Sequence, residues 1–213
     1  MTTWAVVPVK PFIEGKSRLA GILKESERYQ LNVNCLSKTL NVLSGLKTID
    51  KMLVVSRDGE ALKIAIQAGA RALLENGNQG LNQALYQVNN TLDKSCDRVL
   101  IIPTDLPLLV MEDIQKILEL GATPPVVVVV ADRRNNGTNA LLVYPAGCIR
   151  YRFGKYSSKK HLAEAQKRGI KAISANIPDM RLDLDLVEDL EYIKSNGYSW
   201  PIPANNPMEE TVR

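Results

Sequence analysis

Two short runs of the chain are apolar at every position, and they constrain the fold more than any other feature. Residues 99–102 are VLII and residues 126–130 are VVVVV. A strand with one solvated face alternates apolar and polar residues, whereas an unbroken β-branched run predicts a strand covered by helices on both faces. Segments with helical apolar spacing lie between these runs. The alternation predicts an α/β fold, a single domain with a mostly parallel sheet sandwiched by helices.

Periodicity along the rest of the chain predicts further elements in the same alternating order. The expected strands are 4–9, 52–55, 72–74, 99–102, 126–130, 140–143 and 172–177. The expected helices are 60–68, 82–92, 112–120, 158–167 and 187–195, with another that carries Leu31, Leu36, Leu40 and Leu43. The strand at 140–143 could be antiparallel. The proline-rich segment 198–213 lacks periodicity, so we expect one domain over 1–197 followed by a tail.

Charge and cysteine content disfavour several classes of protein. A net charge of +4 and 5% aromatic residues suit an anionic small molecule better than a nucleic acid. Three cysteines without CxxC or Cys/His spacing predict neither a disulfide framework nor a zinc site, and they fit a reducing cytoplasm. No apolar run approaches the ~20 residues of a membrane span, so neither export nor a membrane partner is expected.

Loops after the predicted strands carry the polar residues of interest. Ligands of open parallel sheets bind at the carboxyl ends of the strands, so the loops after 4–9, 99–102 and 126–130 should converge on one crevice. The first loop contains Lys10, Gly15, Lys16 and Arg18. Ser17 could cap the helix that follows. Cations and free N–H groups at a helix N-terminus suit a polyphosphate, although the P-loop pattern is absent and a solvated basic loop is the alternative.

Acidic residues follow the second of these strands and recur near the C-terminal helix. Asp105 lies directly after VLII in a loop stiffened by prolines, where its carboxylate could hold Mg²⁺ with substrate phosphates and a distant partner. Asp183 and Asp185 should point the same way from an extended segment, and one of them could complete the metal site. The alternative for Asp105 is a helix N-cap. Asp189 should favour the first turn of the last helix through the helix dipole.

The segment 131–142 combines groups that could bind a small anion. Gly137 permits close approach of the backbone, and Thr138 and Asn139 offer hydrogen bonds. Arg133 or Arg134 could meet a carboxylate or phosphate bidentately.

Two helix starts could bind further parts of a ligand. Gly154 and Ser157 precede a helix whose N-terminus could receive an anion. For His161, one turn into that helix, a structural or phosphate-binding role is favoured over a general base. In the segment from Gly80, Asn82 could cap a helix or contact a nucleobase edge.

Six of these motifs resemble, in order, one known family. VPVKPFIEGKSRLA, GLNQAL, PTDLPLL, DRRNNGTNALL, FGKYSSKKH and RLDLDLVEDL are similar to the 2-phospho-L-lactate guanylyltransferase family, also called CofC or FbiD. The resemblance implies a Rossmann-like α/β sheet of the nucleotide-diphospho-sugar transferase (GT-A) type, like that of the molybdenum-cofactor guanylyltransferases. It also implies transfer of GMP from GTP to 2-phospho-L-lactate or phosphoenolpyruvate, with release of pyrophosphate, in the biosynthesis of the deazaflavin coenzyme F-420.

The same resemblance assigns roles to the candidate residues. It implies Mg²⁺ at Asp105 and at Asp183 or Asp185. It implies nucleotide contacts at Lys10, Lys16, Gly80 and Asn82, and catalytic roles for Lys16, Arg18 and Asp105. It implies acceptor contacts at Thr138, Gly154 and Ser157, to which we add Arg133, Asn139 and His161. A homodimer, and passage of the product to a downstream transferase, are further expectations.

Three departures from the family pattern leave other activities open. Ala131, Ser158 and the pair 186–187 replace the usual Pro, Phe and Thr-Pro, and Ser158 could alter the acceptor pocket. The alternatives are another acceptor, such as 3-phosphoglycerate, molybdopterin or a sugar phosphate, and a non-catalytic nucleotide-binding regulator. The missing LAGG-type loop argues against molybdopterin and sugar phosphates, and the separate carboxylates argue against the regulator.

Overall fold

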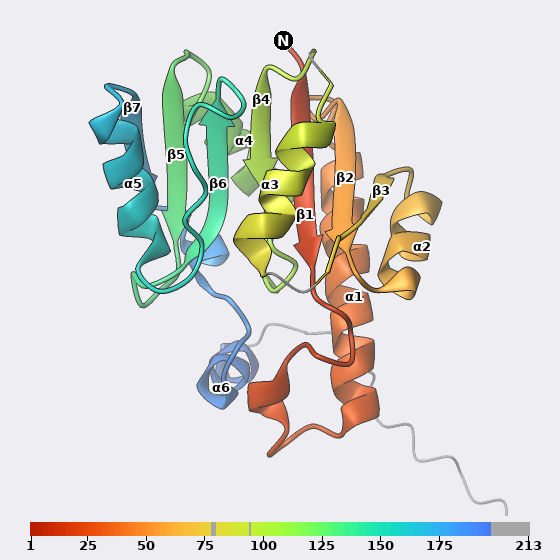
Figure 1. Ribbon diagram of the computed structural model, residues 1–213. Coiled ribbons are helices and arrows are strands. Elements are labelled where there is room, and N and C mark those ends of the chain that lie inside the picture. Colours follow the sequence, from red (N-terminus) through yellow and green to blue (C-terminus); the bar gives the residue numbers. More distant parts are fainter. Residues whose placement is uncertain (78–79, 94, 197–213) are drawn as a thin grey trace, which may run out of the picture.

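The alternating sequence pattern forms one sheet with helices on both faces in the computed structural model, which describes residues 1–77, 80–93 and 95–196 (Figure 1). The strands are β1 (Thr3–Val9), β2 (Lys51–Ser56), β3 (Arg71–Leu74), β4 (Arg98–Ile101), β5 (Val126–Ala131), β6 (Thr138–Tyr144) and β7 (Lys171–Ala175). The helices are α1 (Glu25–Ser44), α2 (Gly59–Gln67), α3 (Leu81–Thr91), α4 (Met111–Leu120), α5 (Ser157–Lys167) and α6 (Val187–Ser195), with 3₁₀ turns η1 (Ser17–Leu19) and η2 (Pro178–Arg181). The predicted tail, 198–213, lies outside the described residues.

Strand order places the loops of interest at one edge of the sheet. The order is β3-β2-β1-β4-β6-β5-β7, and β6 runs antiparallel to its neighbours β4 and β5, whereas the other pairings are parallel. The antiparallel option for 140–143 is therefore confirmed. Because β5 ends and β6 begins at the carboxyl edge, the connecting loop 132–137 lies at the same edge as the loops after β1 and β4.

The two faces of the sheet pack against different helices. One apolar cluster joins α1, α2 and α4 to Val126, Val128 and Val130, and the other joins α3 and α5 to Val127 and Val129. All five valines of this run have no solvent-exposed surface. The prediction that VVVVV is covered on both faces is thus confirmed.

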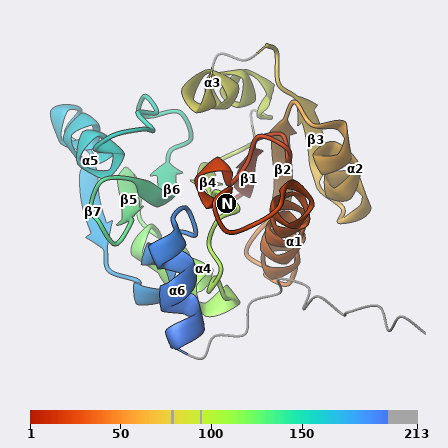
Figure 2. The same cartoon turned by 90° about the horizontal axis from the view of Figure 1, so that it is seen from below.

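A third apolar cluster lies beyond the carboxyl edge of the sheet. It combines η1, the first half of α1, the segment 182–184 and α6, which Figures 1 and 2 show together at that end of the molecule. Leu182 and Leu184 are buried in it, while Asp183 and Asp185 between and after them are half-buried. This alternation confirms that the two carboxylates share one side of the segment.

Two local expectations are wrong. The strand predicted to reach residue 177 ends at Ala175, because its neighbour β5 pairs no further than Val130 with Ala175. Ser17 does not cap a helix: it is the first residue of η1, and Lys16 occupies the N-cap position with φ 56° and no side-chain cap bond.

Among the described residues, no helix is long and apolar enough to cross a bilayer.

Candidate active site

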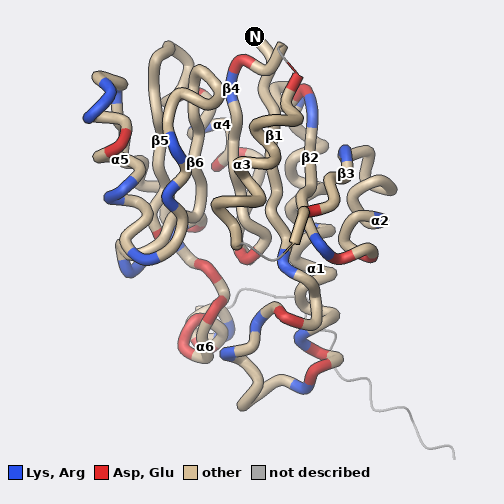
Figure 3. Tube along the Cα trace, viewed as in Figure 1, with Lys and Arg blue, Asp and Glu red and all other residues tan. Residues whose placement is uncertain are grey.

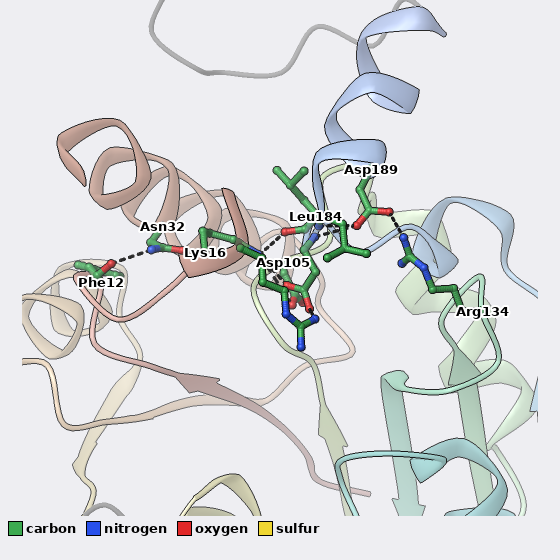
Figure 4. Close-up of polar contacts among 10 residues, drawn as sticks. Phe12, Lys16, Asn32, Asp105, Arg134, Leu184 and Asp189 are labelled. Carbon is green, nitrogen blue, oxygen red and sulfur yellow. Dashed lines mark hydrogen bonds and ion pairs between the residues drawn. The ribbon is translucent and has the colours of Figure 1, made fainter. Parts of the chain in front are cut away.

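Lys16 joins the loop after β1 to the loop after β4 and to the segment before α6 (Figure 4). Its Nζ donates to the Leu184 carbonyl at 2.6 Å and lies 3.5 Å from Asp185 Oδ1 and 3.9 Å from Asp105 Oδ2. The Leu184 N–H in turn donates to the Asp105 carbonyl at 2.9 Å. Three segments that are distant in sequence thereby present a lysine and two carboxylates at one point, as the sequence predicts for the strand ends.

Contacts with α1 and with the start of α2 hold the loop after β1 at Phe12 and Gly15, close to Lys16. The Phe12 N–H donates to Asp58 at 2.7 Å, and the Asn32 amide donates to the Phe12 carbonyl at 2.8 Å. A Cβ at Gly15 would meet the side-chain amide of Asn32, so a larger residue there would have to displace Asn32 from its bond to Phe12. The sequence analysis missed Asn32 because its helical spacing carries no sign of a contact with a loop twenty residues earlier.

The charges of this cluster are not balanced. Burial opposes the charge on the Lys16 ammonium, but the carboxylates around it outweigh burial and raise its pKa, so it stays protonated. Burial, together with Asp105 and Asp185, raises the pKa of Asp183 to about 6. Burial and the neighbouring Asp185 carboxylate also raise the pKa of Asp105, although the Lys16 ammonium opposes this shift. The exposed Arg18 guanidinium lies 4.0 Å from Asp185. Figure 3 shows these mixed charges along the loop after β1 and the segment leading into α6.

Two carboxylate oxygens of the cluster fit a cation. Asp105 Oδ1 and Asp183 Oδ1 are buried and have no hydrogen-bond partner in the part of the chain that the structure describes. Unpartnered buried carboxylate oxygens are costly, and oxygen ligands are those that Mg²⁺ prefers. No group of three or more acidic, His or Cys side chains that could hold a metal occurs within the described residues. The alternative reading of Asp105 as a helix cap is wrong, because Val110 is the N-cap of α4.

Arg133 and Arg134 face Asp189 of α6. Their guanidinium nitrogens lie 2.6 Å and 2.8 Å from Asp189 Oδ1, and Asp189 has no exposed surface. Asp189 also accepts the N–H of Leu186, the N-cap residue of α6, at 2.8 Å, which confirms its predicted place in that first turn. A contact of Arg133 with the acceptor stays a prediction.

A buried hydrogen-bond network connects the start of β6 to α5. The Arg152 N–H donates to His161 Nε2 at 2.8 Å, so that nitrogen is an acceptor and the hydrogen of the neutral ring lies on Nδ1. Nδ1 lies 3.2 Å from Thr138 Oγ1, which is 2.8 Å from Ser157 Oγ. With Nδ1–H donating to Thr138 and Thr138 donating to Ser157, the Ser157 hydroxyl retains its own hydrogen for another acceptor.

Of the two roles left open for His161, structural or phosphate-binding, its hydrogen bonds support the structural one, while its predicted contact with the acceptor stays a prediction. Burial lowers its pKa to about 4 and its side chain is fully buried. Its neutral ring orders Thr138 and the backbone at Arg152 rather than transferring protons.

The turn before α5 is anchored on two sides. The Ser157 N–H donates to the carbonyls of Gly154 and Asn136, and Gly154 has φ +114°, which favours glycine. The Asn82 amide donates to the Phe153 carbonyl at 3.0 Å and accepts the Phe153 N–H at 2.8 Å.

Asn82 is therefore not a helix cap, since Gly80 occupies the N-cap position of α3. A cavity of about 490 Å³ opens beside this contact, lined by Asn82, Arg152, Phe153, Lys160, Ala163, Glu164 and Lys167. The nucleotide contacts of Lys10, Gly80 and Asn82 stay predictions.

Two buried side chains organise the loop 132–137 and its surroundings. Asp132, which the sequence analysis passed over, accepts the N–H groups of Asn136 at 2.7 Å and Gly137 at 2.8 Å. An Asp followed by Asn and Gly is a signal for such a turn and could have identified it. The amide of Asn139 donates to the Met180 carbonyl at 2.9 Å and is buried, so its contact with an acceptor also stays a prediction.

The fold is that of nucleotidyltransferases of known structure. A nucleotidyl transferase of known structure from Methanothermobacter superimposes with a TM-score of 0.65 over 92% of this chain and 97% of the other, at 16% identity, which compares the fold alone. The predicted α/β class with a mostly parallel sheet between helices is confirmed.

Sequence comparison defines the family. The family described as "Guanylyl transferase CofC like" matches residues 3–198, and the chain belongs to it. A phosphoenolpyruvate guanylyltransferase of Rubrobacter xylanophilus is 35% identical over 92% of this chain and 96% of the relative. A 2-phospho-L-lactate guanylyltransferase of Methanothermobacter thermautotrophicus is 34% identical over 92% and 86%. The predicted family and the prediction of a guanylyltransferase enzyme are confirmed.

Proposed function

We propose that this enzyme transfers GMP from GTP to a small phosphorylated three-carbon acid, 2-phospho-L-lactate or phosphoenolpyruvate. The names of the relatives support this acceptor class. The observation that carries the proposal is the convergence of Lys16, Asp105 and Asp185 at the carboxyl edge of the sheet. Such a site suits the binding of phosphates and a cation, and its side chains do not include a nucleophile.

The reaction proceeds without a protein nucleophile. An oxygen of the acceptor phosphate attacks the α-phosphorus of GTP and forms a new P–O–P linkage, while the bond from that phosphorus to the β-phosphate oxygen breaks and pyrophosphate leaves. The attacking oxygen is already ionised near neutral pH, so no general base is required. His161, neutral and buried, fits a site that needs none.

The side chains of the site hold and neutralise the two anions. Lys16, fixed by Leu184 and the carboxylates, supplies a positive charge that stays in place as charge develops on the leaving group. Arg18, exposed beside Asp185, reaches the outer phosphates. The free O–H of Ser157 donates to the acceptor phosphate at the start of α5.

Mg²⁺ completes this proposal. Asp105 and Asp183, whose buried oxygens lack partners among the described residues, would hold the ion, with Asp185 beside them. When bound, Mg²⁺ stabilises the charge on the phosphates in the transition state.

Pyrophosphate release from GTP, with each candidate acid supplied separately, tests the proposal. ATP, CTP and UTP serve as controls for the base, and omission of Mg²⁺ tests the metal. Release with one acid and GTP identifies the acceptor. Silence with both acids despite measurable GTP binding would favour 3-phosphoglycerate or another acceptor, or a regulatory protein.

Asp105→Asn separates chemistry from folding. We expect kcat to fall roughly 100-fold or more with the circular dichroism spectrum unchanged, because the variant loses a charge placed at the reacting phosphates. Glu119→Gln, an exposed change on α4, is the matched control. A fully active Asp105→Asn enzyme would exclude this carboxylate from the mechanism.

A further inference from the structure

Asp189 contacts both sides of the candidate site with its two carboxylate oxygens. Oδ1 accepts from Arg133 at 2.6 Å and from Arg134 at 2.8 Å, both in the loop between β5 and β6. Oδ2 accepts the N–H of Asp185 at 3.0 Å and that of Leu186 at 2.8 Å, in the segment before α6. Figure 4 shows Asp189 between Arg134 and this segment.

Helix capping alone does not explain this arrangement. A capping carboxylate needs only the amide hydrogens at the helix start, and an exposed Asp supplies that function. Asp189 is instead completely buried, and two guanidinium groups from another loop compensate its charge. Arg133 also lies 5.5 Å from the ring centre of Tyr192 on α6, which adds a second contact between the loop and the helix.

The carboxylate of Asp189 stays ionised in this setting. Burial opposes the charge, but the bonds from Arg134 and from the N–H groups of Leu186 and Asp185 outweigh burial and lower its pKa. Removal of this side chain would leave two guanidinium groups and two backbone N–H groups without the carboxylate that accepts their hydrogen bonds.

We infer that Asp189 is a positioning residue that sets the location of the Asp185 carboxylate by holding the Asp185 backbone against the Arg133–Arg134 loop. The inference rests on the proposed function, since it assigns Asp189 to the support of the proposed metal and phosphate site. The next link along the segment is the Leu184 N–H bond to the Asp105 carbonyl, which Asp189 does not itself touch. Through that bond, the position of the segment also determines the distance between the carboxylates of residues 105 and 185.

Two measurements on Asp189→Asn and Asp189→Ala test this inference. Mn²⁺ binding, followed by the electron paramagnetic resonance signal of free Mn²⁺, should weaken roughly 10–100-fold, as is typical when the support of a metal ligand is removed. Hydrogen exchange of the Leu184 amide should accelerate as well, although Asp189 makes no bond to it. Ile193→Val, a buried change on the same helix that removes one methyl group from the core, is the control and should alter neither result.

The outcomes distinguish positioning from capping. If the variants lose stability but bind Mn²⁺ as the wild type does, and only the amides of Asp185 and Leu186 exchange faster, Asp189 is a helix cap and the inference is overturned. If the wild type itself binds no Mn²⁺, the metal part of the proposed function fails. In that case the hydrogen exchange rate of the Leu184 amide in the Asp189 variants still tests whether Asp189 is a positioning residue.

Discussion

Replacement of His161 by glutamine should remove a large pH dependence from the stability of this enzyme. His161 is fully buried, accepts the Arg152 N–H on Nε2 and contacts Thr138 through Nδ1. Its pKa is about 4 in the folded chain, against an ordinary value of 6.5. The folded protein therefore excludes a proton that the unfolded chain binds.

The sign and size of the effect follow from this difference. The stabilisation by neutral His161 is complete above pH 6.5 and declines as the pH falls to about 4, where the folded protein also becomes protonated. The difference between the two pKa values corresponds to about 3 kcal/mol of unfolding free energy. Asp183 acts in the opposite direction, because its raised folded pKa of about 6 makes the folded protein gain stability as it takes up a proton. The comparison must therefore be between wild type and His161→Gln at each pH.

Urea unfolding of both proteins between about pH 7.5 and 4.5 measures this difference. The unfolding free energy of the wild type relative to the variant should decrease by about 2.5 kcal/mol across that range, because pH 4.5 still lies above the folded pKa. His161 is the only histidine in the sequence, so its ring gives one histidine titration in the NMR spectrum. A titration midpoint near 6.5 in the folded protein, or a constant difference in stability, would refute the reasoning.

Two further predictions concern the loops around the site. Gly15→Ala should lower turnover and cost about 1–3 kcal/mol, because the new methyl group would displace Asn32 and move the loop that carries the site lysine. Gly21→Ala, with open space at its Cβ, is the control, and equal activity of the two variants in a pyrophosphate assay would contradict the prediction. Asn82→Ala should raise KM for the acceptor, because both ends of the amide bind Phe153 next to the turn before α5, and an unchanged KM would contradict this role. A loss of the preference for GTP over ATP in the same variant would support the predicted contact of Asn82 with the nucleotide.

The positions of the site carboxylates could be predicted in part from their place in the sequence. Asp105 was located from a buried run followed by a rigid loop, and Asp183 and Asp185 from their spacing of two, and the structure brings these segments together. The chemistry of carboxylates at a strand end already suggested Mg²⁺, and the resemblance to a family linked the cluster to GTP. Neither source indicated that Lys16 would be buried among the carboxylates, because a sequence does not show which side chain loses its solvent.

Sequence alone determined the class of the fold, since unbroken apolar strands and intervening amphipathic helices leave few ways to bury both faces of a sheet. It also determined the loops on which the site would lie. Only the tertiary structure decided which polar groups pair: Asn82 binds Phe153 instead of capping its helix, and Asp189 receives both arginines of a loop more than fifty residues earlier. The pattern of apolar and polar residues in the sequence predicts periodicity and burial. Such pairings depend instead on distances between segments that come together only when the chain folds.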